Sequence, residues 1–153
     1  MTPLPDRGSG SEPEPPIETL VLPSRLESID SGRRWTARCA QGAGVDEDVV
    51  AELELVLTEA LSNIIRHAYG GDPDQEIHLT LAISERVIAL SLRDTGRPFD
   101  ESAYRPPDLD RPGAGGYGVQ LISDLMDEVH RKPLLGGGTL MEMRKLRKEV
   151  RGG

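Results

Sequence analysis

The stretch PGAGGYGVQLISDLMDEV, residues 112–129, contains the spacing G-x-G-x-x-G at Gly113, Gly115 and Gly118. This spacing is the fingerprint of dinucleotide-binding βαβ units, in which it directly follows a strand. Here it follows AYRPPDLDRP, and prolines of this kind exclude a central strand. The acidic residue that the βαβ unit needs about twenty residues later is also missing. The sequence therefore predicts a different fold around these glycines.

One feature of a phosphate site is still present in this stretch. Gly115, Gly116 and Gly118 precede the apolar residues of a helix that we predict near residues 118–126. Bare backbone N–H groups at the N-terminus of a helix bind phosphate well. The P-loop pattern G-x-x-x-x-G-K-[ST] is absent. The three glycines are therefore candidates for binding the phosphates of a nucleotide in another fold.

The rest of the chain alternates between the two-residue period of strands and the longer period of helices. Hairpins at both ends of the chain favour an α+β fold. We expect a two-layer α/β sandwich, with a mixed, mostly antiparallel sheet covered by helices on one face. The predicted order is a strand (17–22), two helices (24–41 and 46–69), two strands (76–84 and 87–94), a loop (97–116), a helix (118–126) and two strands (128–132 and 139–146).

Local signals mark the start of the first two helices. Ser24 and Glu27 have the spacing of a capping box, and Asp46 is placed to cap the second helix. The first helix carries Leu26, Ile29 and Arg33 at helical spacing. The second helix has one apolar stripe that we expect to face the sheet, formed by Val49, Leu53, Leu57, Ala60, Leu61, Ile64 and Ala68.

Composition excludes several classes of protein. The formal net charge of −8 argues against binding nucleic acid through its phosphates. No apolar run approaches the roughly 20 residues of a membrane span. The single cysteine, Cys39, and the lack of a signal peptide favour a reducing, cytoplasmic location. We expect one domain over residues 17–147, a disordered N-terminal tail over 1–16 and a short C-terminal tail over 148–153.

Glu59 and Asn63 lie four residues apart on one flank of the second helix, beside its apolar stripe. An acid and an amide at this spacing suit a hydrated Mg²⁺ ion, or a general base paired with a metal ligand. The alternative is a solvated hydrogen bond between the two side chains, and the residues alone leave both interpretations open.

Asp94 and Thr139 are polar residues at inward-facing positions of two predicted strands. Asp94 has the parity of the apolar residues of its strand, and a buried carboxylate is costly unless it accepts hydrogen bonds. Gly96 follows it, where the backbone can approach a ligand closely. Thr139 has the parity of Met141 and Met143. The alternatives are an Asx-turn at the strand end for Asp94 and an ordinary strand threonine for Thr139.

The loop over residues 97–116 is rich in proline, glycine and aspartate and poor in apolar residues. A loop of this length inside a compact domain is usually functional. We therefore predict a mobile lid that a bound nucleotide would protect from proteolysis.

Four stretches together resemble a known family. EALSNIIRHAY (59–69), DTGRPFD (94–100), GGYGVQLISDLMDEV (115–129) and GGGTLMEM (136–143) are similar to the N box, the two glycine boxes and the closing strand of the Bergerat-fold ATPases. The D-x-G-x-P-F-D form and the H-A-Y ending fit best with the bacterial anti-sigma factor serine/threonine kinases. The resemblance covers roughly residues 17–147.

The resemblance implies how a nucleotide would be bound at its adenine end. Asp94 would accept a hydrogen bond from the adenine amino group, and Gly96 would let the ring approach. Thr139 would support Asp94 and the edge of the adenine. In this subgroup a proline, here Pro98, usually replaces the second glycine of the D-x-G-x-G form.

The resemblance also implies the chemistry at the phosphate end. Asn63 would bind Mg²⁺ between the phosphates, and Gly115, Gly116 and Gly118 would present backbone N–H groups to them. Glu59 would take the proton from the attacking serine or threonine hydroxyl. This is phosphoryl transfer by positioning and charge neutralisation with one general base.

Partners follow from the resemblance alone. It implies a homodimer that sequesters a sigma factor and phosphorylates a small anti-anti-sigma antagonist, with no direct contact to nucleic acid or membrane. Two alternatives stay open. The chain could be an ATP-gated binding module without useful phosphoryl transfer, or a partner-switch protein in a pathway without a sigma factor. The acid at position 59 favours the kinase over the binding module.

Overall fold

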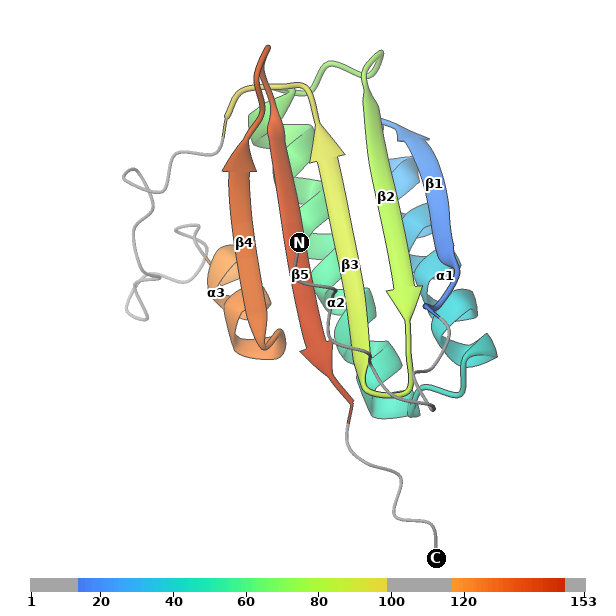
Figure 1. Cartoon of the computed structure of the whole chain (residues 1–153). Coiled ribbons are helices and arrows are strands. Elements are labelled where there is room, and N and C mark those ends of the chain that lie inside the picture. Colours follow the sequence, from blue (N-terminus) through green and yellow to red (C-terminus); the bar gives the residue numbers. More distant parts are fainter. Residues whose placement is uncertain (1–13, 99–116, 148–153) are drawn as a thin grey trace, which may run out of the picture.

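The computed structural model describes residues 14–98 and 117–147, which form two layers (Figure 1). One layer is a five-stranded sheet in the order β1-β2-β3-β5-β4, and every neighbouring pair is antiparallel. The predicted α+β sandwich is confirmed, with an antiparallel rather than a mixed sheet in the described part. The strands are β1 (Ile17–Pro23), β2 (Glu76–Ile83), β3 (Val87–Asp94), β4 (Glu128–Pro133) and β5 (Thr139–Leu146).

The second layer consists of helices that cover one face of the sheet (Figure 1). They are α1 (Glu27–Gly42), α2 (Glu47–Asn63), the π-helical turn η1 (Ile64–Ala68) and α3 (Tyr117–Leu125). Among the described residues, no helix has the length and apolar character needed to cross a bilayer. The expected tails over 1–13 and 148–153, and residues 99–116 of the expected lid, lie outside the described residues.

The core lies between the two layers and follows the predicted alternation of β2 and β3. The register pairs Leu79 with Leu92 and Leu81 with Leu90, so that apolar side chains of both strands face the helices. These four residues are 1% exposed or less. Because the alternation continues to the end of β3, it also places Asp94 on the buried face.

Helix α1 packs through small residues, and Leu26, which we expected within the helix at helical spacing, lies just before its first residue. Leu26 is 62% exposed. A Cβ on Gly32 would lie 2.8 Å from a methyl carbon of Leu61 and 3.0 Å from one of Leu22. The absence of a side chain there lets α1 approach α2 closely. The buried residues of α1 are Ser28, Gly32, Thr36, Ala37 and Ala40.

The predicted capping box at Ser24 is also wrong. Ser24 is 1% exposed, and its hydroxyl donates to the carbonyl of Asp72 at 2.5 Å and accepts from the N–H of Gln75 at 3.0 Å. It therefore fixes the turn before β2 instead of the start of α1. Helix α2 does begin after Asp46, but that side chain makes no capping hydrogen bond.

The long second helix predicted over 46–69 ends at Asn63 and continues as the π-helical turn η1. The backbone N–H of Tyr69 donates to the carbonyl of Ile64 at 3.0 Å, which closes the wide turn. Gly70 and Gly71 follow with positive φ angles of 58° and 86° and lead the chain away. Single π-turns in α-helices are frequent at functional sites.

Lys145 of β5 joins the two layers near the end of α3. Its ammonium group pairs with the carboxylate of Glu52 at 2.6 Å and donates to the carbonyl of Leu125 at 2.5 Å. The side chain is only 13% exposed. A cation at this point satisfies a carbonyl at the C-terminus of α3 and suits the dipole of that helix.

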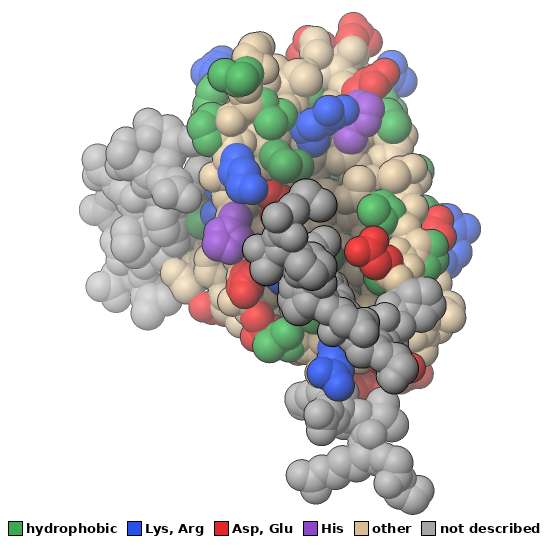
Figure 2. All heavy atoms as spheres, viewed as in Figure 1, with side chains coloured by type: hydrophobic (Ala, Val, Ile, Leu, Met, Phe, Trp, Pro, Cys, Tyr) green, Lys and Arg blue, Asp and Glu red, His purple; other side chains and the backbone are tan. Residues whose placement is uncertain are grey.

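The other face of the sheet carries a mixture of side chains. Figure 2 shows hydrophobic, basic, acidic and histidine side chains intermixed over it. The hydroxyls of Thr80 and Ser91 hydrogen-bond across β2 and β3, and Lys132 pairs with Glu142 at 2.9 Å across β4 and β5. This is the pattern of an antiparallel sheet with one face turned away from the core.

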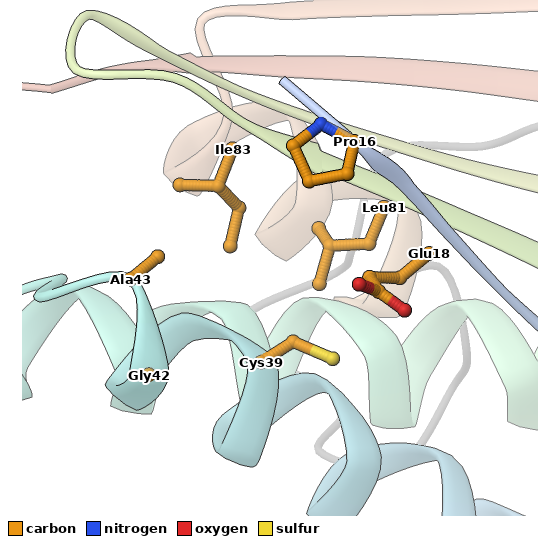
Figure 3. A pocket seen from close by; sticks show the side chains of 7 residues that line it. All are labelled: Pro16, Glu18, Cys39, Gly42, Ala43, Leu81 and Ile83. Carbon is orange, nitrogen blue, oxygen red and sulfur yellow. The ribbon is translucent and has the colours of Figure 1, made fainter.

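A pocket of about 220 Å³ lies between α1 and the β1–β2 pair, at the end of the sheet opposite to Asp94 (Figure 3). The thiol of Cys39 and the carboxylate of Glu18 point into it (Figure 3). Burial raises the pKa of the Cys39 thiol, and the nearby Glu18 charge adds to this effect. Cys39 therefore lacks the low thiol pKa of a nucleophile.

Candidate functional site

Glu59 and Asn63 lie half-buried on the last turns of α2, where α3 packs against this helix. Their side chains form no hydrogen bond with each other or with another residue of the described part of the chain. The alternative of a simple hydrogen bond between them is therefore not seen. A half-buried carboxylate and amide left in this state retain their full capacity to bind a ligand.

Gly118, the second residue of α3, lies directly against both of these side chains. A Cβ at this position would stand 2.5 Å from Oε2 of Glu59 and 3.5 Å from Nδ2 of Asn63. Only glycine gives this approach without displacing the carboxylate. The structure thus brings together three of the predicted site residues from two helices. Gly115 and Gly116, the other predicted glycines, lie outside the described residues.

Asp94 ends β3 with its carboxylate on the helix side of the sheet, and it is 4% exposed. Oδ1 accepts the backbone N–H of Gly96 at 3.0 Å, which is the Asx-turn that the sequence left as an alternative. Burial raises the pKa of this carboxyl group, while hydrogen bonds from the backbone of Gly96 and Thr139 act in the opposite direction. Burial is the larger effect, so ionised Asp94 needs a further donor.

Thr139 begins β5 directly opposite Asp94 in the register of β3 and β5, and it is 6% exposed. The two predicted inward-facing polar residues are therefore neighbours. The glycine before Thr139 makes this approach possible. Gly138 has a φ angle of 97°, and a Cβ on it would lie 2.0 Å from the carbonyl oxygen of Asp94.

Gly96 packs against the end of η1. A Cβ on Gly96 would lie 2.2 Å from the carbonyl oxygen of Ala68 and 2.9 Å from Cδ1 of Tyr69. The carbonyl of Ala68 also accepts the backbone N–H of Arg97 at 2.7 Å. The sequence predicted that the backbone at Gly96 would approach a ligand closely. In the structure, the groups that it approaches closely are Ala68 and Tyr69 of the protein itself. Tyr69 is the residue at this site that the sequence did not predict. Its only signal in the sequence is its place at the end of the H-A-Y motif.

The donor set at Glu59 and Asn63 fits a magnesium ion that a nucleotide brings with it. Across residues 14–98 and 117–147, no group of three or more His, Cys, Asp or Glu side chains could hold a metal ion. Mg²⁺ in phosphate-transfer sites commonly takes only one or two protein oxygens, together with phosphate oxygens and waters. The amide oxygen of Asn63 could serve as one such ligand, and the Glu59 carboxylate lies close to it against Gly118.

Comparisons with known proteins show the family to which the chain belongs. The family model of the histidine kinase-like ATPase domain matches residues 22–145. The serine-protein kinase RsbW of Listeria monocytogenes (serotype 4a, strain HCC23) is 30% identical over 119 residues, which cover 72% of this chain and 76% of that protein. The anti-sigma F factor of Geobacillus stearothermophilus is 31% identical over 133 residues, with 82% and 89% covered.

A solved structure shows the same fold. The RsbU and RsbW domains of a Mycobacterium tuberculosis protein match with a TM-score of 0.64 at 17% sequence identity. The match covers 89% of this chain and 34% of that one, so the chain spans about a third of the solved protein. The family model and the curated relatives together place the sequence. This chain belongs to the histidine kinase-like ATPase domain family, together with the RsbW serine-protein kinases and the anti-sigma F factors.

Proposed function

We propose that this chain is an ATP-dependent serine/threonine protein kinase that acts as an anti-sigma factor. The observation that carries the proposal is the meeting of Glu59, Asn63 and Gly118 at one point between α2 and α3. A proton acceptor, an amide ligand and the first turn of a helix together suit the transfer of a phosphoryl group. The names of the curated relatives, a serine-protein kinase and an anti-sigma F factor, support both parts of the proposal.

The adenine of ATP binds at Asp94 in this proposal. Asp94 is buried, and in its ionised form it accepts a hydrogen bond from the adenine amino group. Thr139 supports the carboxylate from the opposite strand. Gly96 lets the turn after Asp94 pack against Ala68 and Tyr69, and the backbone of this turn borders the ring in this proposal. GTP presents an oxygen where ATP presents the amino group, so the site selects ATP over GTP.

The triphosphate lies along the N-terminal end of α3. Gly118, with Gly115 and Gly116 before it, donates backbone N–H groups to the phosphate oxygens. Asn63 would hold Mg²⁺ through its amide oxygen, and the ion would supply positive charge to offset that of the phosphates. No further protein ligand is needed for an ion shared with phosphates and water.

Glu59 acts as the general base. It accepts the proton of the substrate hydroxyl while the hydroxyl oxygen bonds to the γ-phosphorus. The bond from that phosphorus to the bridging oxygen breaks, and ADP leaves with the bond's electron pair. The products are a phosphoserine or phosphothreonine, ADP and the proton carried by Glu59, which is then released to solvent, so atoms and charge balance.

The substrate in this proposal is a small anti-anti-sigma antagonist protein, and the sequestered partner is a sigma factor. We also propose that the kinase is a cytoplasmic homodimer that contacts neither nucleic acid nor membrane directly. Light scattering of the purified protein tests the dimer. Pull-down from the native cell with mass spectrometry tests the partners, and would expose a partner-switch protein that acts without a sigma factor.

The kinase itself is tested by comparing Glu59→Gln with Asn63→Ala. Glutamine keeps the size of Glu59 but loses its basicity, so ATP affinity stays within a few fold while phosphoryl transfer falls by about 10²–10⁴. Asn63→Ala removes a metal ligand and weakens Mg-dependent nucleotide binding instead. Sequestration of the sigma factor survives Glu59→Gln, because binding a partner needs no proton transfer.

Labelled phosphate transfer to the antagonist is the measurement, with binding followed separately by calorimetry. Transfer at the wild-type rate by Glu59→Gln rules out Glu59 as the base. A wild-type protein that binds ATP but never phosphorylates its native partner is a binding module and not a kinase.

A further inference from the structure

Tyr69 bridges two neighbouring strands at the adenine end of the candidate site. Its hydroxyl donates to the carbonyl of Glu76 at 2.5 Å and accepts the backbone N–H of Thr95 at 2.8 Å. The last regular pair between these strands joins His78 and Arg93. Continuing that register places Glu76 opposite Thr95. The phenol of Tyr69 therefore takes the place of the next backbone rung between β2 and β3.

The bridge does not come from either of the two strands. Tyr69 follows η1, the continuation of the helix that carries Glu59 and Asn63. Its hydroxyl contacts the backbone of Thr95, the residue directly after Asp94. One side chain thus links the helix of the phosphate end to the strand end that carries the adenine acceptor.

Two further contacts hold the same junction. The N–H of Arg97 donates to the carbonyl of Ala68 at 2.7 Å, and Gly96 lies against Ala68 and the ring of Tyr69. Thr95, Gly96 and Arg97 therefore each contact Ala68 or Tyr69 at the end of η1. The Tyr69 hydroxyl accepts the backbone N–H of Thr95, the residue next to Asp94.

We propose that Tyr69 is a positioning residue that sets the place of the Asp94 carboxylate relative to Glu59 and Asn63, and so determines base selectivity. The proposal rests on the assignment of Asp94 as the adenine acceptor. A carboxylate selects an amino group over a carbonyl oxygen only when it is held in hydrogen-bonding position. A shift well below 1 Å is enough to weaken such a contact, and supporting groups prevent that shift.

Tyr69→Phe removes one oxygen and keeps the packing of the ring. We expect ATP affinity to fall by about three- to tenfold, the range that one net hydrogen bond supplies. GTP affinity and the affinity for inorganic triphosphate with Mg²⁺ stay within about twofold, because neither uses Asp94 as an acceptor. The ratio of ATP to GTP affinity therefore falls, which a loss of stability alone would not produce.

Thr80→Val is the matched control. It removes a hydroxyl that also hydrogen-bonds across β2 and β3, but on the face of the sheet away from the helices. It leaves the ATP to GTP ratio at the wild-type value. Calorimetry with ATP, GTP and triphosphate on the wild type, Tyr69→Phe, Thr80→Val and Asp94→Asn completes the set, with thermal melts to show that each variant is folded.

The outcomes separate the assignment of Asp94 as the adenine acceptor from the assignment of Tyr69 as a positioning residue. If Asp94→Asn loses selectivity and Tyr69→Phe keeps the wild-type ratio, the positioning role is overturned while the adenine acceptor stands. If ATP, GTP and triphosphate all weaken equally in Tyr69→Phe, its role is merely structural. If Asp94→Asn binds ATP as the wild type does, the acceptor assignment fails first.

Discussion

A methyl group on Gly118 would stand 2.5 Å from the Oε2 atom of Glu59, closer than any relaxed contact between these atoms allows. The atom it would meet is the far end of a flexible side chain and not the backbone. Glu59 can therefore move away at little cost to folding, but the carboxylate then leaves the position proposed for proton transfer.

We expect Gly118→Ala to separate stability from activity. Alanine is favoured over glycine in a helix by about 0.8–1 kcal/mol, so the melting temperature stays level or rises. Phosphoryl transfer falls by at least tenfold, because a displaced base no longer reaches the substrate hydroxyl. Thermal melts and labelled phosphate transfer on the same preparation measure the two effects.

Gly42→Ala is the control for that experiment. Gly42 is also a helical glycine, the last residue of α1, and a Cβ added there would meet no atom within 4 Å. This variant keeps wild-type transfer. A Gly118→Ala protein with wild-type transfer would show that the contact with Glu59 has no bearing on catalysis.

Asp94→Asn is expected to act in opposite directions on folding and binding. Burial raises the pKa of Asp94, so the ionised group destabilises the folded protein at neutral pH. Asparagine keeps the acceptor oxygen without the charge, and the melting temperature of the free protein stays level or rises. ATP affinity falls by about ten- to a hundredfold, the value of a lost charged hydrogen bond of about 1.5–3 kcal/mol. A variant that melts lower and still binds ATP normally would contradict both statements.

The raised pKa of Asp94 also predicts a dependence on pH. Below the ordinary carboxyl range the group is protonated in both folded and unfolded chains, and the penalty is absent. As the pH rises through the folded pKa, the group ionises and stability relative to Asp94→Asn is lost. ATP affinity changes the other way, since protonated Asp94 is a poorer acceptor for the adenine amino group. Titrations of both proteins from neutral to acidic pH should therefore show their ATP affinities converging.

Gly138 and Gly136 offer a matched pair for the junction of β3 and β5. Both have positive φ, at 97° and 91°, so alanine at either position costs about 1–3 kcal/mol of strain. Only at Gly138 would the new methyl group also meet a backbone atom, the carbonyl oxygen of Asp94 at 2.0 Å. Chemical unfolding should show a much larger loss for Gly138→Ala than for Gly136→Ala, and equal losses would exclude the clash.

The strands were predictable because the alternation of apolar and polar residues that indicates a strand lies within a few neighbouring positions of the sequence. The alternation around Leu90 and Leu92 fixes which face of β3 is buried, and with it the orientation of Asp94. The start of α3 followed from the glycines for a similar reason. The contact between Gly118 and Glu59 did not, because it depends on how two helices far apart in sequence pack.

Other features depended on tertiary contacts that compete with local signals. Ser24 has capping-box spacing, yet its hydroxyl hydrogen-bonds to the turn before β2. That turn provides an acceptor, the carbonyl of Asp72, and a donor, the backbone N–H of Gln75. Helix α1 has little apolar pattern in its sequence. Its buried face consists of Gly32 and other small residues, which let the helix backbone lie close to its neighbours without large apolar side chains. The π-turn after Asn63 and the bridge made by Tyr69 have no periodic signature at all.

The pairing of β3 with β5 has a consequence for how the protein folds. Asp94 and Thr139 come from distant parts of the chain and meet only when that pairing is complete. Long-range pairings of this kind form late, after the entropy of closing the loop has been overcome. The proposed adenine contacts therefore need the completed pairing of β3 with β5. ATP at a hundredfold excess over its Kd should then add about 2.7 kcal/mol to the stability of the whole domain, by mass action.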